Sequence, residues 1–266
     1  RAGDSAQLSA AFSPSTAADR VRWSASDPTV AYIDPAGGRV TAVRPGSTQL
    51  TASTGSGVSA VCTVTVTAGK AQDDSLVIAD AAPCRFTGGA AKTDVTVCTV
   101  SALAGGQAVT TGDPLNLRLW PSTQYAAAAQ LPYGTSVSIL AAVRDDSGRL
   151  WCAVEAPTDD GTVRGFVVAD SLRAFTGVKT LDEGRDYTLS WSANDRAGTA
   201  YVTATAAGSR CSGAATGSFF LYDWRMLCSR SSASSLASRM GCVTVSGTLD
   251  GRDVSGWAVK DEQFVT

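Results

Sequence analysis

The stretch LDEGRDYTLSWSANDRAGTAYVTATAAGSRCSGAATGSFFL, residues 181–221, decides the fold class of this part of the chain. Polar and apolar residues alternate over residues 187–191 and 200–205, and a polar turn separates the two segments. Alternation with a period of two is typical of a half-buried β-strand. With a third strand at residues 218–221, the stretch predicts a sheet with one apolar face, which a second layer must cover.

Composition extends the all-β prediction to the whole chain. Its 266 residues suggest at least two domains, and alternation rather than helical periodicity runs through a sequence rich in Val, Thr, Ser, Ala and Gly. Charged residues make up 17% and the net charge is −2, so no basic surface for nucleic acid or an anionic membrane is expected. No apolar run is long enough to span a bilayer. The sequence begins at Arg1 in the middle of a β pattern, and we expect that a natural N-terminus has been removed.

The chain contains no histidine, which argues against an enzyme. Histidine is the usual proton-transfer group near neutral pH and the commonest metal ligand, and both Ser-His-Asp and Cys-His catalysis require it. The seven cysteines include no C-x-x-C pair, so a zinc site is not expected either. We therefore predict no catalytic activity, no cofactor and no metal site in this segment.

The carboxylates do not change this prediction. Asp182 and Glu183 are neighbours on a strand and point to opposite faces, which makes a poor acid–base pair. The Asp pairs at residues 145–146 and 159–160 occur in turn contexts, where Asp commonly bonds the local backbone. Neither loop has the regular D-x-D-x-D-G spacing of a calcium site.

Two interpretations of the cysteines stay open. An extracellular β-protein is expected to form disulfides, and the preferred pairs are Cys84 with Cys98 and Cys211 with Cys228, each closing a short loop. Alternatively, several of the cysteines are small buried hydrophobic residues. The odd number leaves at least one thiol free or paired outside this segment. The cysteines are Cys62, Cys84, Cys98, Cys152, Cys211, Cys228 and Cys242.

Residues 1–67 contain strands every 8 to 12 residues with turn signals between them, the pattern of a β-sandwich. The segment resembles the group 2 bacterial immunoglobulin-like (Ig-like) domain, and this resemblance implies a core position for Trp23. The family's first strand is not apparent before residues 2–4, so we expect the sequence to start slightly late. The matching positions are Trp23, Ser24, Ser26, Pro28, Val30, Ala31, Asp34, Gly38, Val40, Ala42 and Gly46.

A second sandwich is expected from two separated pieces. Residues 178–222 resemble the second half of an Ig-like repeat of Gram-positive surface proteins, and residues 86–100 resemble its first half. We therefore predict a discontinuous Ig-like sandwich from residues 74–106 and 177–222, interrupted by an inserted domain. Insertion in a loop is tolerated because loop-closure entropy grows only slowly with length. The alternative is two small domains without a shared sheet, each of which would leave a sheet uncovered.

The inserted segment, residues 113–174, resembles a bacterial SH3-like domain. Trp120 replaces the usual glycine of that family, and Phe166 replaces a tryptophan. The matching positions are Leu115, Asn116, Leu117, Arg118, Pro121, Ser122, Thr123, Tyr125, Leu131, Gly134, Val137, Ile139, Leu140, Trp151, Val154, Gly161, Gly165, Phe166, Val167 and Leu172. Residues 223–266 parallel the end of this segment and predict a degenerate second SH3-like unit.

Aromatic side chains of the SH3-like segment are the candidate ligand-binding residues. In a shallow groove such rings stack on a peptide or sugar while an Arg or Asp fixes the orientation. The candidates are Arg118, Trp120, Tyr125, Tyr133, Trp151 and Phe166. The alternative is that Trp151, Phe166 and Tyr125 form barrel core or pack against the host sandwich.

Three functions remain open at this level. The first is a non-catalytic, extracellular segment of a bacterial surface or secreted protein, whose SH3-like units bind cell-wall peptide or glycan (peptidoglycan) or a surface partner. The second is a purely structural stalk. The third is the accessory, targeting region of a cell-wall hydrolase whose catalytic domain lies outside this chain. Oligomeric state cannot be inferred from the sequence.

Overall fold

The computed structural model describes residues 1–13, 19–69, 73–125, 127–158, 161–222, 243–249 and 252–258. These residues form β-strands joined by turns and two short 3-10 helices, so the all-β prediction is confirmed. The chain divides into two compact units. Unit 1 contains residues 1–73 and 100–178, and unit 2 contains residues 74–99 and 179–266.

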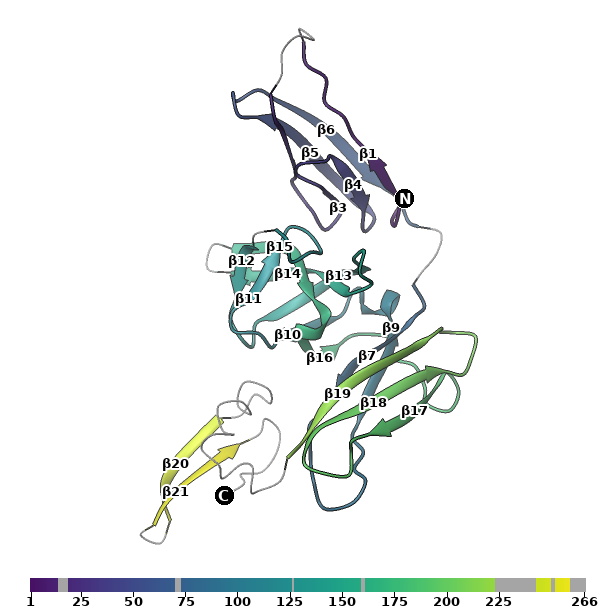
Figure 1. Cartoon of the computed structure of the whole chain (residues 1–266), viewed down its shortest axis with the longest axis vertical. Coiled ribbons are helices and arrows are strands. Elements are labelled where there is room, and N and C mark those ends of the chain that lie inside the picture. The colour runs from purple at the N-terminus through teal and green to yellow at the C-terminus, as the bar shows by residue number, and fades with distance from the viewer. Residues whose placement is uncertain are drawn as a thin grey trace. The chain divides into compact units, whose positions relative to one another are not determined.

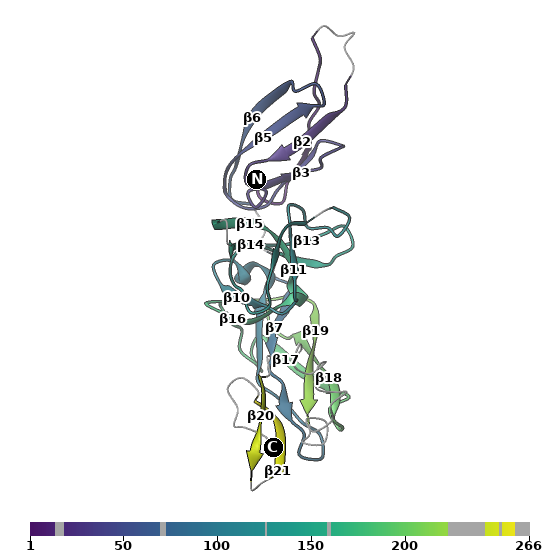
Figure 2. The same cartoon turned by 90° about the vertical axis from the view of Figure 1, so that its left-hand side faces the viewer.

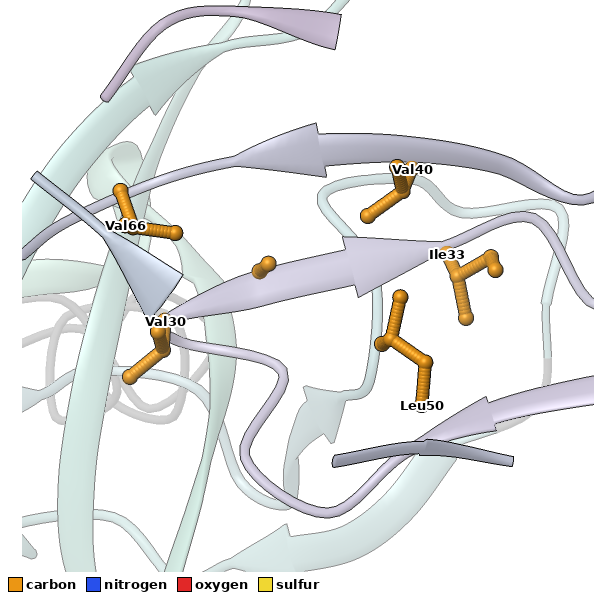
Figure 3. Close-up of a cluster of buried hydrophobic side chains, with 6 residues drawn as sticks. Val30, Ile33, Val40, Leu50 and Val66 are labelled. Carbon is orange, nitrogen blue, oxygen red and sulfur yellow. The ribbon is translucent and has the colours of Figure 1, made fainter. Parts of the chain in front are cut away.

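The N-terminal part of unit 1 is a sandwich of two three-stranded sheets, in the orders β1-β4-β3 and β2-β5-β6 (Figure 1). Alternate residues of these strands point inward, and the resulting core contains Val30, Ile33, Val40, Leu50 and Val66, which Figure 3 shows between the two sheets. Trp23 is half-buried and packs against this core. The strands are β1 (Ser5–Gln7), β2 (Val21–Ala25), β3 (Ala31–Ile33), β4 (Arg39–Ala42), β5 (Gly46–Thr54) and β6 (Ser59–Val66).

The rest of unit 1 is a seven-stranded half-barrel in the order β12-β11-β15-β14-β13-β10-β16. Figure 2 shows β10 and β16 side by side at one end of it, where they pair antiparallel. The strands are β10 (Gln107–Thr110), β11 (Leu115–Arg118), β12 (Ala127–Leu131), β13 (Ser136–Arg144), β14 (Leu150–Thr158), β15 (Gly161–Val168) and β16 (Leu172–Thr176). A 3-10 helix, η2 (Ala169–Ser171), separates β15 from β16.

The half-barrel begins earlier in the chain than the sequence suggested. Residues 100–106, which we expected in the discontinuous sandwich, belong to unit 1, and β10 precedes the expected start at residue 113. The reason is local burial and hydrogen bonding. Leu103 of η1 (Val100–Leu103) is fully buried, and the Gly105 N–H donates to the Ile139 carbonyl at 2.8 Å.

Unit 2 brings together two pieces of the chain that are far apart in sequence. An antiparallel pair, β7 (Leu76–Ala81) and β9 (Val95–Thr99), lies against a sheet in the order β17-β18-β19-β8. That sheet contains β17 (Tyr187–Ser192), β18 (Gly198–Ala206), β19 (Ala214–Tyr222) and the short β8 (Cys84–Arg85). Leu76, Val97, Tyr187 and Ala204 form one buried cluster, against which Leu189 packs.

Backbone hydrogen bonds also join the two pieces of unit 2. The Leu181 N–H donates to the Val97 carbonyl at 2.9 Å, and the Leu76 N–H donates to the Ser212 carbonyl at 3.0 Å. Asp186 is 1% exposed, and its carboxylate accepts hydrogen bonds from the Asp182 N–H and from Arg185 and Arg210. The Asp182 N–H bond and the two arginines lower the pKa of Asp186, although burial opposes them.

The structure contains no disulfide among the described cysteines, so the Cys84–Cys98 expectation is not met. Cys98 is a fully buried free thiol, and burial raises its pKa to about 12. Cys211 is also a buried free thiol, whereas its expected partner Cys228 lies outside the described residues. Cys98 therefore acts as a small buried hydrophobic residue, the second of the two interpretations of the cysteines.

Most of the predicted C-terminal unit, residues 223–266, lies outside the described residues. Within it the structure describes one antiparallel pair, β20 (Val243–Leu249) and β21 (Arg252–Ala258). The prediction of a second SH3-like unit therefore stays a prediction. Within the described ranges, no helix has the length and hydropathy needed to cross a bilayer.

Candidate functional site: the outer face of the half-barrel

Strands β13, β14 and β15 present two faces, which follow from their register. Ala141 pairs with Ala153, which pairs with Phe166, so these three residues share one face. Trp151 shares it as well, because it lies two residues before Ala153. We call this the outer face, and its members are Ala141, Val143, Trp151, Ala153, Phe166 and Val168. The opposite, inner face contains Ile139, Cys152, Val154 and Val167.

Two of the candidate binding residues are buried on the outer face. Trp151 is 2% exposed and Phe166 is fully buried. The Trp151 indole donates to the Asp145 carboxylate at 2.9 Å, and the Arg149 guanidinium lies 6.0 Å from the Trp151 ring centroid. These two aromatic residues are therefore held in place by neighbours and are not open to a ligand in this state.

The cover over Phe166 comes from the N-terminal sandwich. Tyr32 of β3 meets Phe166 edge to face, with ring centroids 5.6 Å apart and an interplanar angle of 84°. Val43, which follows β4, is 7% exposed in the same cluster as Trp151 and Phe166. The alternative interpretation from the sequence was barrel core or packing against the host sandwich, whereas the packing partner of Phe166 in the structure is the first sandwich of unit 1.

Three other candidates cluster around the end of β11. The Trp120 and Tyr125 rings lie 4.7 Å apart at 34°, and the Arg118 guanidinium donates to the Tyr125 carbonyl. Tyr125 also reaches the first sandwich, because its hydroxyl lies 3.5 Å from the Asp34 carboxylate. Trp120 Nε1 is buried and has no hydrogen-bond partner among the described residues. Both rings are half-buried.

Tyr133 is the candidate that stands apart. It is 41% exposed in the turn between β12 and β13, and no described contact joins it to the other five. The predicted groove of six residues therefore divides into a buried pair, a half-buried trio and one exposed tyrosine.

Charged residues surround the outer face. Arg164 of β15 bonds Glu155 at 2.7 Å and Asp27 at 2.8 Å, and Asp27 also bonds Arg44 at 3.2 Å. Burial by itself would raise the pKa of Asp27, but hydrogen bonds from Thr29 and Arg164 and the charge of Arg44 lower it below the usual value. Burial raises the pKa of Tyr32, and the nearby carboxylates of the half-barrel's turns raise it further.

Sequence reasoning missed Asp27, Tyr32 and Val43 as partners of the half-barrel. One signal was present, since the run Trp151-Cys152-Ala153-Val154 is apolar at every position. A strand with one solvated face alternates, whereas a strand buried on both faces reads as a continuous apolar run. All four residues are indeed buried, which requires a cover on the outer face.

No cluster of three or more Cys, Asp or Glu side chains suited to a metal ion occurs among the described residues. Asp145 instead caps its own turn, accepting from the Ser147 and Arg149 N–H groups. The Asp pair at residues 159–160 lies outside the described residues.

Comparisons with known proteins identify the first sandwich. A lacto-N-biosidase of Bifidobacterium bifidum is 46% identical over 65 residues, which cover 24% of this chain and 6% of that enzyme. A crystal structure of the S-layer protein rSbsC aligns with 91% of this chain, over 29% of the S-layer chain, at 15% identity and a TM-score of 0.18. Residues 1–66 match the family model of the bacterial Ig-like domain (group 2), and this part of the chain is such a domain.

Proposed function

We propose that this chain is a non-catalytic, extracellular spacer segment of a bacterial surface or secreted protein. The observation that carries the proposal is the burial of Trp151 and Phe166 against the Ig-like domain. A face that packs on a neighbouring domain forms a contact between domains and is not an open ligand groove. The match of residues 1–66 to a non-catalytic Ig-like family supports the same role.

The proposal includes a domain organisation. We propose that residues 74–99 and 179–222 form one discontinuous Ig-like sandwich and that the half-barrel is an SH3-like domain inserted into it. The shared cluster of Val97 and Tyr187 supports the sandwich, and the Leu181–Val97 hydrogen bond supports an insertion whose ends lie close together. The lacto-N-biosidase match supports an accessory role beside a catalytic domain elsewhere in a longer protein.

A second candidate function, binding of cell-wall peptide or glycan, has its own observation. The Trp120–Tyr125 pair is only half-buried, and a tilted aromatic pair beside a carboxylate is suited to a sugar or peptide face. In this alternative the pair, together with the exposed Tyr133, replaces the buried Trp151 and Phe166 as the contact surface.

A sedimentation assay with purified peptidoglycan separates the two functions. The spacer proposal expects the wild-type chain to remain in the supernatant. The wall-binding function would be supported instead if the wild type pellets with peptidoglycan, Trp120→Ala does not, and the matched control Tyr201→Ala still does. Tyr201 is a suitable control because it is 44% exposed and lies on β18 in the other unit.

A further inference from the structure

The outer face of β13–β15 needs a partner, whatever the protein does. Four of its six side chains, Ala141, Trp151, Ala153 and Phe166, are at most 8% exposed, and the other two, Val143 and Val168, are half-buried. The inner face of the same strands is filled by the half-barrel's own apolar residues. A sheet buried on both faces requires two covering layers, and the half-barrel supplies only one of them.

The first sandwich covers this face with complementary chemistry. Tyr32 supplies an aromatic edge to Phe166, and Val43 supplies an aliphatic contact to the same cluster. Asp27 supplies a carboxylate to Arg164, which Glu155 holds from the other side. The contact therefore combines an apolar centre with a charged rim, as specific protein interfaces do.

Asp27 is preorganised for this contact by its own domain. Its carboxylate accepts from the Thr29 N–H at 3.0 Å and from the Thr29 hydroxyl at 2.5 Å, and Arg44 bonds its other oxygen. Arg164 bonds that same oxygen, so the carboxylate that Arg164 reaches is also held by Thr29 and Arg44 of its own domain. Preorganised groups lose little entropy when they bind.

We propose that the outer face is a docking site for a carboxylate-and-aromatic surface, and that the Ig-like domain of the same chain fills it in cis. Arg164 recognises the carboxylate of Asp27, and Phe166 recognises the ring of Tyr32. While the site is filled, no external partner reaches Trp151 or Phe166. This inference rests on the same contact as the proposed function, but the two are tested separately: retention on peptidoglycan tests the function, and solvent contact of Trp151 tests the docking.

The decisive variant removes both contacts while leaving the cores intact. In Tyr32→Ala/Arg164→Glu the ring contact is lost and a like charge faces Asp27 and Glu155. The control Tyr133→Ala/Arg22→Glu changes the same residue types at exposed positions with no described side-chain contact to the other domain. Losing a hydrogen bond to a charged group together with an aromatic pair lowers the docking equilibrium constant by roughly 100-fold.

Fluorine-19 NMR of the full chain labelled with 5-fluorotryptophan measures the result. The Trp151 resonance is assigned by its loss in Trp151→Phe, and its H2O/D2O isotope shift measures contact with solvent. We expect this shift to appear in the decisive variant and not in the wild type or the control. The resonance of Trp23, which packs on the Ig-like core, stays unchanged if that domain remains folded. A folded variant whose Trp151 stays protected would overturn the proposal.

Complementation between two full chains tests the recognition itself. One chain carries Asp27→Asn/Tyr32→Ala and keeps the outer face, and the other carries Arg164→Glu/Phe166→Ala and keeps the Ig-like surface. Each alone is expected to sediment as a monomer, and their mixture is expected to form a one-to-one complex at about 1 mM, near the effective concentration of a short tether. A mixture that stays monomeric while both variants remain folded would refute specific recognition of the Ig-like surface.

Discussion

Replacing Leu76 by alanine tests the claim that unit 2 is one sandwich built from two distant pieces. Leu76 lies on β7, is 3% exposed, and belongs to the cluster of Val97, Tyr187 and Ala204. The substitution removes three carbon groups at about 0.8 kcal/mol each, and the cavity adds to this. We expect a loss of about 3 kcal/mol in the free energy of unfolding of unit 2, within the usual range for a buried Leu→Ala change.

Hydrogen exchange read by mass spectrometry locates this loss. About 3 kcal/mol corresponds to a roughly 150-fold larger opening constant. If the pieces share a core, amides of β17 and β18 lose protection together with those of β7 and β9, whereas amides of β13–β15 in unit 1 do not. The control Val61→Ala, at a position 58% exposed on β6, leaves both units unchanged. Faster exchange confined to β7 and β9, with full protection of β17 and β18, would refute the shared sandwich.

Three further predictions follow from single sites. Under native conditions a maleimide is expected to modify the exposed Cys62 but not Cys98, because Cys98 is buried and its pKa is raised to about 12. Modification of Cys98 before Cys62 would contradict the burial of Cys98. The contribution of Asp27 to stability is fully present above its ordinary pKa of 3.8 and is lost as the pH falls through its lowered pKa in the folded chain. The Tm of the wild type is therefore expected to fall more steeply in acid than the Tm of Asp27→Asn, and equal slopes would contradict this. Gly38→Ala is expected to lower the free energy of unfolding of the first sandwich by about 1–3 kcal/mol, measured by urea unfolding. The reason is that Gly38 has φ +72° and a Cβ there would lie 2.8 Å from the Leu8 carbonyl oxygen. An unchanged urea midpoint would contradict this strain.

Local pattern predicted much of the strand content. The alternating segments at residues 187–191 and 200–205 fall within β17 and β18, and the segment at residues 218–221 falls within β19. These predictions succeeded because a strand's alternation depends only on which face each residue presents. The position of Cys98 could not be predicted in this way, since spacing alone does not tell whether two cysteines approach each other or face a core.

The candidate site was harder to predict than the strands. Sequence reasoning selected Trp151 and Phe166 as aromatic residues of a groove, and the structure buries both. It also grouped Tyr133 with them, although Tyr133 lies in an exposed turn with no described contact to the others. Aromatic character is the same whether a ring binds a ligand or fills an interface, so residue type could not separate these outcomes.

Residue identity and short-range spacing were enough to predict an all-β chain with an N-terminal Ig-like pattern. The packing of Tyr32 on Phe166 and of Asp27 on Arg164 became apparent only in the folded chain. The burial of a face depends on segments that are distant in the chain, and their approach is set by the packing of whole sheets rather than by any local pattern.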